Sequence, residues 1–391
     1  MSLKTAFAKL TDKHVIILMV LVTVGIAIQC YVAGGGDQYT HYNNYMIFKS
    51  SFEHLIHHKN LYGLHPEQHY DYYKYSPAFA LCMSAFYYLP DWLGLIIFNL
   101  TNTLVLLVAF KKLKLPIANI KYLFLFILIE LAISLSMTQT NALIAGLIIL
   151  GFTFLEKENY FIAALFLSLT VFIKLFGLVA FALWFLYPNK PRFLLYSMFW
   201  FVVLTFLPLL VIPLANLLEQ YNNWIVLLKN DHDASYGISF LGWVHSWFHL
   251  DLPKTATVLV AAVVFCLPLI RFQLYKVYAF RLQMLSSILL WVVIFNHKGE
   301  NPTYIIAMSG VAIWYFSRKA NKTNKALLWL ALIFTSFSST DLITPGFIAD
   351  KYVEPYALKA VFCCIIWFKI IMEMLTKKTL DLPEDASAKT I

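Results

Sequence analysis

Charged side chains interrupt the apolar runs of this chain at only a few positions, and chemistry is expected there. Asp37 follows the first apolar run, behind glycines 34–36 that permit a tight turn and close approach of another molecule. Lys174 lies inside the run 171–177, where a charge costs about 2.5–3.5 kcal/mol on insertion scales. Asp37 is either a general base or a solvated interfacial carboxylate. Lys174 is either a phosphate ligand or a side chain that extends to the membrane surface.

Two amide side chains mark a turn between further apolar runs. Gln139 and Asn141 flank Thr140 at this turn. Their amide groups can form hydrogen bonds with a sugar hydroxyl or a phosphate oxygen. They can equally cap the helix ends on either side of the turn. The residue types leave both interpretations open.

A dense polar turn at 296–301 separates two apolar runs near the end of the chain. His297 and Lys298 can donate hydrogen bonds to a phosphate, and Glu300 can orient one of them. Pro302 is suited to begin the following helix. The turn is therefore a candidate phosphate site, and a plain polar loop is the alternative.

Metal-ligating residue types occur, but not at spacings that define a site. Asp231, His232 and Asp233 are adjacent, and adjacent residues seldom bind one ion well. HExxH, GxSxG and Walker motifs are absent from the sequence, which disfavours a metalloprotease, a serine hydrolase and an ATPase. No cofactor is expected, and a divalent metal is not favoured. The other histidines and all the cysteines considered show no zinc spacing: His41, His57, His58, His65, His69, Cys30, Cys82, Cys266, Cys363 and Cys364.

The composition identifies the surroundings in which these residues must work. Of 391 residues, 60% are hydrophobic and 13% are charged, and the mean hydropathy is +0.70. Soluble globular chains carry about 25% charged residues, so this chain needs lipid as its solvent. The formal net charge is +9. Its basic residues form short clusters between apolar runs, which indicates membrane topology and no nucleic-acid partner.

The apolar runs predict an all-α polytopic membrane protein, because a helix needs about 20 apolar residues to cross a bilayer. Several runs are shorter, so some neighbours are expected to be paired half-helices. About twelve spans are predicted, at 14–33, 92–110, 121–138, 141–156, 159–172, 174–187, 192–215, 254–271, 281–297, 301–317, 325–341 and 356–376.

The charge bias of the loops predicts the orientation. With the N-terminus inside, this count of spans puts every compact basic cluster on the cytoplasmic side. A miscount by one span would scatter the clusters over both faces. The clusters are Lys4 to Lys13, Lys111 to Lys114, Lys157, Asn189 to Arg192, Arg271 to Arg281, Arg318 to Lys322, and Lys377 with Lys378.

One membrane domain, 1–378, is predicted, followed by a disordered cytoplasmic tail at 379–391. The segment 77–89 is apolar but too short to cross, and crossing would place the Lys111 cluster outside. It is therefore interpreted as a re-entrant or interfacial helix that Pro77 begins. The long outer loops are 34–76, with helix expected around 40–57, and 216–253.

The candidate residues converge on one face. The topology, which follows from charge bias alone, places seven candidate residues from several parts of the chain on the outer side. A carboxylate there can take a proton from an attacking hydroxyl, and cations can stabilise a departing phosphate. The residues are Asp37, Lys74, Gln139, Asn141, Lys174, His297 and Glu300.

Three stretches resemble known motifs. An aspartate follows the first span, and the later segment Tyr73–Ala80 is similar to the motif YxYPPxxA. This segment includes Lys74, Tyr75 and Pro77. Leu135–Ala142 is similar to a GQxN turn, and Ala164–Gly177 is similar to a stretch that ends in IKxxP. The chain thus resembles glycosyltransferase family 87, whose members are integral-membrane enzymes of the GT-C type related to bacterial α-1,2-mannosyltransferases. Ser76, Thr138 and Gly177 depart from the family pattern.

The resemblance implies an enzyme of the bacterial inner membrane with its active site on the periplasmic face. It implies transfer of a hexose such as mannose, with inversion, from a polyprenyl-phosphate sugar to a lipid or glycan acceptor. Asp37 would be the base, and Lys174 and His297 would hold the donor phosphate. Lys298, Gln139, Asn141, Tyr75, Lys74 and Glu300 would complete the substrate site.

Two other classes of function remain as alternatives. A transporter or flippase of a lipid-linked sugar would share the basic cavity but would not need Asp37 as a base. Transporters more often show internal repeats with broken spans in matching halves, and none is evident in this sequence. A purely structural membrane protein would leave Lys174 and the long polar loop at 34–76 unexplained.

Overall fold

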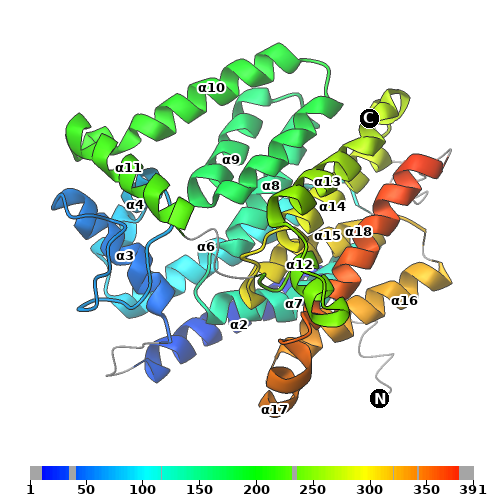
Figure 1. The fold of residues 1–391 in the computed structure, drawn as a ribbon, viewed down its shortest axis with the longest axis horizontal. Coiled ribbons are helices and arrows are strands. Elements are labelled where there is room, and N and C mark those ends of the chain that lie inside the picture. Colours follow the sequence, from blue (N-terminus) through cyan, green and yellow to red (C-terminus); the bar gives the residue numbers. More distant parts are fainter. Residues whose placement is uncertain are drawn as a thin grey trace.

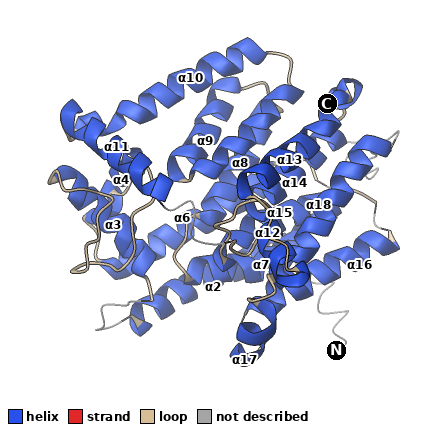
Figure 2. Cartoon of the chain, in the orientation of Figure 1, coloured by secondary structure: helices blue, strands red, loops and turns tan. Residues whose placement is uncertain are grey.

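The computed structural model describes residues 11–34, 41–115, 117–230, 236–319, 321–340 and 343–377. All regular structure within these ranges is helical (Figures 1 and 2). The predicted all-α fold is therefore confirmed for the described part of the chain. Asp37, the triplet 231–233 and the predicted tail 379–391 lie outside the described residues.

The first half of the chain alternates long apolar helices with short helical pieces. The order is α2 (Asp12–Ala33), α3 (Asn43–Ile56), α4 (Pro77–Cys82), α5 (Ser84–Tyr87), α6 (Asp91–Lys112), α7 (Ile117–Ser136), α8 (Asn141–Leu155), α9 (Tyr160–Ile173), the 3₁₀ helix η1 (Leu175–Leu186) and α10 (Lys190–Phe206).

The second half contains more breaks, because prolines and π or 3₁₀ turns interrupt several of its helices. The order is η2 (Leu207–Leu210), α11 (Leu214–Asn230), α12 (Phe240–Phe248), α13 (Lys254–Cys266), η4 (Leu267–Ile270), η5 (Phe272–Lys276), α14 (Tyr278–Ile294), η6 (Asn301–Thr303), α15 (Tyr304–Phe316), α16 (Lys322–Ala331), η7 (Leu332–Ser336), η8 (Phe337–Ser339), α17 (Gly346–Ile348), η9 (Ala349–Val353) and α18 (Leu358–Thr376).

Three described helices are long and apolar enough to cross a membrane: Asp12–Ala33, Asp91–Lys112 and Lys190–Leu210. Shorter apolar helices, such as Tyr278–Ile294, occupy other predicted spans. At about 1.5 Å per residue these fall short of a hydrocarbon core about 30 Å thick. The structure therefore supports membrane helices, and the count of twelve spans stays a prediction.

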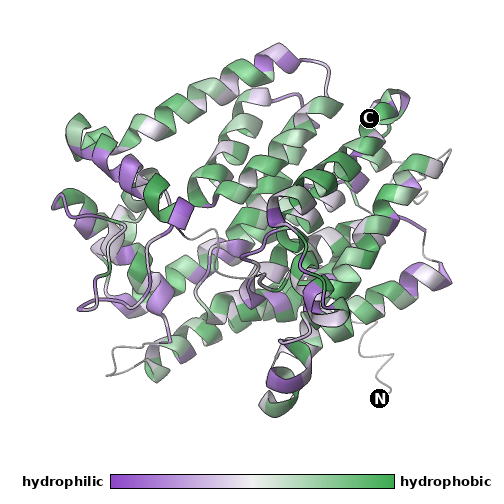
Figure 3. Ribbon diagram, in the orientation of Figure 1, coloured by the Kyte–Doolittle hydropathy of each residue, from purple (hydrophilic) through white to green (hydrophobic). Residues whose placement is uncertain are grey.

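The bundle buries its centre and exposes apolar side chains at its edges. Helices α14 and α15 pack together, and α8 packs between α6 and α9. Trp314 and Trp367 are fully enclosed there. At the edges, Leu21 and Val32 of α2 and Leu195 of α10 are more than 60% exposed. Figure 3 shows that apolar colour covers the long helices and polar colour gathers at loops, the distribution expected of helices surrounded by lipid.

The loop after α2 and the segment 77–89 contain the short helices that the sequence predicts. Helix α3 occupies 43–56, within the stretch expected to be helical. Helix α4 begins at Pro77, and the Ser76 hydroxyl accepts a hydrogen bond from the Phe79 N–H at 3.2 Å as its N-cap. Helices α4 and α5 are 6 and 4 residues long. Neither is long enough to cross a bilayer.

Several basic stretches that charge bias assigns to one side contact one another or their neighbours. Arg281 forms a two-point ion pair with Glu156, with nitrogen–oxygen distances of 2.5 and 2.8 Å. The Arg271 guanidinium donates to the Lys377 carbonyl oxygen at 2.7 Å, and Arg318 pairs with Glu373. These contacts link the ends of helices that are distant in sequence and fix that end of the bundle.

Candidate functional site

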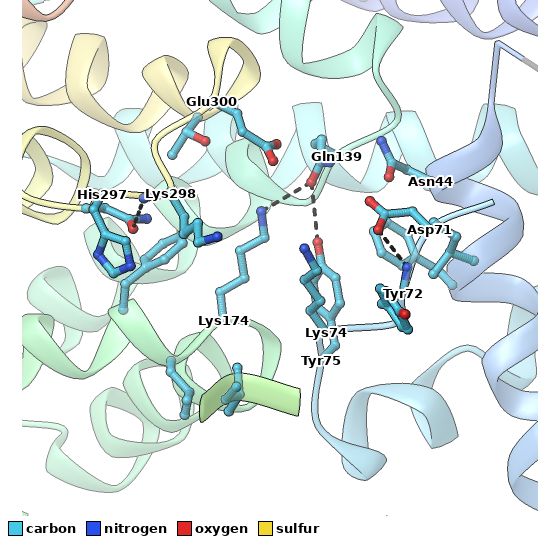
Figure 4. A pocket seen from close by; sticks show the side chains of 17 residues that line it. Asn44, Asp71, Tyr72, Lys74, Tyr75, Gln139, Lys174, His297, Lys298 and Glu300 are labelled. Atoms are coloured by element: carbon cyan, nitrogen blue, oxygen red, sulfur yellow. Dashed lines mark hydrogen bonds between the residues drawn. The ribbon is translucent and has the colours of Figure 1, made fainter. Parts of the chain in front are cut away.

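A cavity of about 420 Å³ lies where six separate stretches of the chain meet (Figure 4). It combines three lysines with one histidine, two carboxylates and several amide and aromatic groups, and we call it the lysine cavity. Its lining residues are Asn44, Ile47, Phe48, Asp71, Tyr72, Lys74, Tyr75, Gln139, Lys174, Leu175, Phe176, Leu228, Asn296, His297, Lys298, Glu300 and Thr303.

Lys174 enters the cavity because the helix breaks at this residue. Helix α9 ends at Ile173, and Lys174 takes an extended conformation with φ −141° and ψ 125° before η1 begins. The close return of the chain requires Gly177, where an added Cβ would lie 2.4 Å from Thr170 Oγ1. The break turns the half-buried Lys174 side chain from the apolar run into the cavity.

The Lys174 ammonium is bound by two amide oxygens. Its Nζ donates to Gln139 Oε1 at 3.2 Å and to Asn141 Oδ1 at 3.0 Å. The N-cap residue of α8 is Thr140, and its side chain makes no cap hydrogen bond. Gln139 and Asn141 therefore orient Lys174 in this structure, and the capping interpretation of these amides is not observed.

The turn that carries Gln139 and Asn141 is itself unusual. Thr138 has φ 48°, a left-handed conformation that glycine adopts without strain and a β-branched residue rarely adopts. The family motif GQxN has glycine at this position, and the left-handed backbone conformation explains that preference. The Thr138 hydroxyl accepts a hydrogen bond from the Tyr45 N–H at 3.1 Å, which ties the turn to α3. Asn141 Nδ2 also donates to the Pro302 carbonyl oxygen at 3.0 Å.

Tyr75 forms one wall beside Lys174. Its hydroxyl donates to Gln139 Oε1 at 3.3 Å, and its ring centre lies 5.7 Å from Lys174 Nζ. The ring stacks on Phe79 at a centroid distance of 5.0 Å. Burial raises the pKa of the Tyr75 phenol well above its usual range, so Tyr75 acts as a neutral hydrogen-bond donor.

The turn at 296–301 forms the opposite wall and is pinned by close backbone packing. Gly237, with φ 54°, approaches so near that an added Cβ would lie 2.6 Å from the His297 carbonyl oxygen. The Ile238 N–H donates to the Gly299 carbonyl oxygen at 2.7 Å, and the Lys298 N–H donates to Asn296 Oδ1 at 3.0 Å. The backbone that carries His297, Lys298 and Glu300 therefore has a defined position.

The structure thus brings together most of the residues that the sequence singled out. Lys74, Tyr75, Gln139 and Lys174 line the lysine cavity with the turn residues His297, Lys298 and Glu300. Asn141 is not among the lining residues, but its side-chain oxygen accepts a hydrogen bond from the Lys174 ammonium. Asp37 lies outside the described residues, so its place in the site stays a prediction.

Sequence reasoning missed two groups of residues. Asn44, Asp71 and Tyr72 line the cavity but come from a long polar loop and α3, where nothing marks them among many polar residues. Glu130 and Lys359 form a buried ion pair behind the turn at 296–301. Both lie inside apolar runs, so the rule that selects Lys174 would also have selected them.

The cavity can bind an anion and transfer a proton. Lys174, Lys74, Lys298 and His297 present cationic or donor groups, and Asp71 and Glu300 present carboxylates. Within the described ranges, no group of three histidine, cysteine or carboxylate side chains could hold a metal ion. The geometry suits a phosphate group held by amines, with a carboxylate nearby.

The fold and the cavity define a class: a helical membrane-type protein with a lysine-lined cavity among its helix ends. The model of glycosyltransferase family 87 matches residues 73–295, more than half of the chain. The chain belongs to this family and is a glycosyltransferase. The match contains the motifs around Tyr75, Gln139 and Lys174. None of the curated proteins compared with the chain matches it.

Proposed function

We propose that this glycosyltransferase moves a sugar, such as mannose or another hexose, from a polyprenyl-phosphate donor to a lipid or glycan acceptor on the periplasmic side of a bacterial inner membrane. The observation that carries the proposal is the convergence of three lysines and a histidine on one cavity in a chain of this family. A polyprenyl-phosphate sugar carries a single phosphate on a membrane-bound tail. The cavity offers lysine and histidine side chains for the phosphate, and the surrounding helices are apolar.

The lysine cavity supports specific roles for its residues. Lys174, Lys298 and His297 hold the phosphate of the donor, and Gln139 and Asn141 keep the Lys174 ammonium in place. These cations stabilise the negative charge that grows on the phosphate as the bond to the sugar breaks. Tyr75 donates its neutral hydroxyl within the same cavity.

The reaction needs a base on the side of the sugar opposite the phosphate. The acceptor hydroxyl loses its proton to a carboxylate, its oxygen forms a bond to the anomeric carbon, and the phosphate leaves with the electron pair of the broken bond. This displacement inverts the anomeric centre. Asp37 is the proposed base, and it precedes the cavity residue Asn44 by seven positions. Asp71 is a second carboxylate that already lines the cavity.

The proposal assigns metal-independent chemistry, because amines and a histidine supply positive charge to the leaving phosphate. It also places the cavity on the side opposite the basic loops, with both termini in the cytoplasm. The contacts among Glu156, Arg281, Arg271 and Lys377 support a common face for those loops.

The test is a transfer assay with the purified full chain in lipid nanodiscs. Radiolabelled polyprenyl-phosphate mannose is supplied with a membrane lipid extract as acceptor, and products are separated by chromatography. We expect labelled glycolipid and released polyprenyl phosphate, with and without a chelator of divalent metals. A parallel experiment places the chain in sealed proteoliposomes, where donor that crosses the bilayer intact without any sugar transfer would contradict the proposal and favour a flippase.

A further inference from the structure

A second cavity of about 350 Å³ adjoins the lysine cavity, and the Tyr72 side chain lines both. We call it the amide cavity, because three of its lining residues are asparagines. It lies between the loop that follows α3 and one face of α11. Its lining residues are Asn60, Tyr62, Tyr72, Asn223, Val226, Leu227 and Asn230.

The four residues from α11 share one helical face. Asn223, Val226, Leu227 and Asn230 follow the spacing i, i+3, i+4 and i+7, which brings side chains to one side of a helix. Asn223 and Asn230 therefore lie at the two ends of this face, with the apolar residues Val226 and Leu227 between them. Neighbouring Leu228 lines the lysine cavity, so α11 borders both cavities.

The walls of the amide cavity are fixed by hydrogen bonds to neighbouring backbone. The Gln220 side chain accepts a hydrogen bond from the Leu61 N–H at 3.0 Å and donates one to the Lys59 carbonyl oxygen at 3.0 Å. Because Lys59 and Leu61 flank Asn60 in sequence, these two bonds hold α11 beside Asn60. Trp224 Nε1 donates to the Lys74 carbonyl oxygen at 3.1 Å. The shape of the cavity is set by the fold, because the buried side chains of Gln220 and Trp224 hold its two sides together.

The chemistry of the lining selects an uncharged, hydroxyl-rich ligand. None of the lining residues is charged at neutral pH, so the cavity offers no cationic side chain to pair with an anion. Each asparagine amide both donates and accepts hydrogen bonds, as sugar hydroxyl groups do. The Asn223 side chain makes no hydrogen bond to the described residues. Tyr72, 39% exposed, presents an aromatic face on which the C–H side of a sugar ring can pack.

We propose that the amide cavity binds a neutral carbohydrate group of the acceptor. This inference rests on the proposed sugar transfer and names the acceptor class as a neutral glycan or glycolipid headgroup, in place of a simple hydroxylated lipid. Because Tyr72 lines both cavities, an acceptor sugar held in the amide cavity can direct a hydroxyl past Tyr72 toward a donor sugar in the lysine cavity.

The test is saturation-transfer NMR with the full chain in nanodiscs, which avoids detergents that carry sugar headgroups. The probe is mannotriose, a neutral trisaccharide, with no donor present. The variant is Asn223→Ala/Asn230→Ala, and the matched control is Asn222→Ala, an exposed residue of the same helix that does not line the cavity. Equal thermal unfolding of the three proteins shows that folding is unchanged.

We expect the wild type and the Asn222→Ala control to bind the trisaccharide, and the double variant to bind about tenfold more weakly because two hydrogen-bonding amides are lost. Equal binding by the double variant, or no binding by the wild type, would overturn the inference. Asparagine-dependent binding by a wild type that transfers no sugar would support the cavity's specificity and would contradict the proposed function alone.

Discussion

Lys359 Nζ lies 2.7 Å from Glu130 Oε1, and the two side chains are 2% and 0% exposed. The same ammonium donates to Asn301 Oδ1 at 2.7 Å. Asn301 directly follows Glu300, a lining residue of the lysine cavity. An ion pair between α7 and α18 thus holds the turn at 296–301 from inside the bundle.

The buried ion pair predicts a marked asymmetry between single and double substitutions. Lys359→Met leaves the Glu130 carboxylate buried without its cation, and we expect a loss of about 3–5 kcal/mol in the free energy of unfolding. Glu130→Gln/Lys359→Met removes both charges and should be more stable than Lys359→Met. Thermal unfolding in nanodiscs measures both. A double variant no more stable than the single one would contradict this role for the charge pair.

A second prediction concerns Lys174. Lys174→Met removes the ammonium that Gln139 and Asn141 orient. We expect the KM for the polyprenyl-phosphate donor to rise about 10- to 100-fold, which corresponds to one charge-assisted hydrogen bond. The KM for the acceptor should change much less.

The control for Lys174 is Lys229→Met, which removes an exposed lysine of α11 that lines neither cavity. Steady-state kinetics of both variants separate loss of a phosphate contact from a general loss of positive charge. An unchanged donor KM in Lys174→Met would argue against contact with the phosphate.

Much of the lysine cavity could be predicted, because polar residues in apolar runs are costly and therefore conspicuous. Lys174, Gln139 and the turn at 296–301 stand out in this way, and the structure places all of them around one cavity. Helix α3 was predictable within the loop after α2. Asp71 was not, because a carboxylate in a polar loop is not conspicuous.

Other features depend on packing that no local pattern encodes. Glu130 and Lys359 are 229 positions apart, so their pairing follows only from the arrangement of α7 and α18. The extended residue at Lys174 depends on Gly177 lying against Thr170. The number of membrane crossings is similarly beyond the sequence, because broken helices such as α16 with η7 are too short to be counted by length.

A third prediction separates the two carboxylates that could act as the base. Asp37→Asn should lower kcat by about 10²- to 10⁴-fold, the usual contribution of a general base. Asp71→Asn, which alters a described wall of the cavity, should reduce kcat far less. Each variant keeps the shape of the side chain and removes only its basicity. Comparable kcat values for Asp37→Asn and the wild type, with a large loss in Asp71→Asn, would reassign the base to Asp71.

A fourth prediction follows from a cluster of three histidines, formed by His54 of α3 with His65 and His69 of the loop at 57–76. The His54 ring stacks on His65 at a centroid distance of 3.7 Å, and His54 Nε2 lies 2.6 Å from Gln68 Oε1. Burial, followed by the charges of His65, His69 and Lys59, lowers the pKa of His54 to about 4, although the Gln68 contact opposes the shift. Burial also lowers the pKa of His69.

The sign of the pH effect follows from proton binding. Between about pH 6.5, the usual histidine pKa, and pH 4, the unfolded chain binds a proton at His54 that the folded chain does not. The free energy of unfolding therefore falls as the pH drops through this window, by about 3 kcal/mol at most for His54.

Thermal unfolding between pH 7.5 and 4.5 measures this dependence, and His54→Gln is the variant to compare. Glutamine does not titrate, so the variant should lose part of the dependence on pH while His69 contributes the rest. The variant also loses the stacking on His65, so its stability at pH 7.5 should be lower than that of the wild type. The slope against pH is therefore the informative quantity. Identical slopes for the two proteins would show that His54 is protonated equally in the folded and unfolded states, contrary to its burial in this cluster.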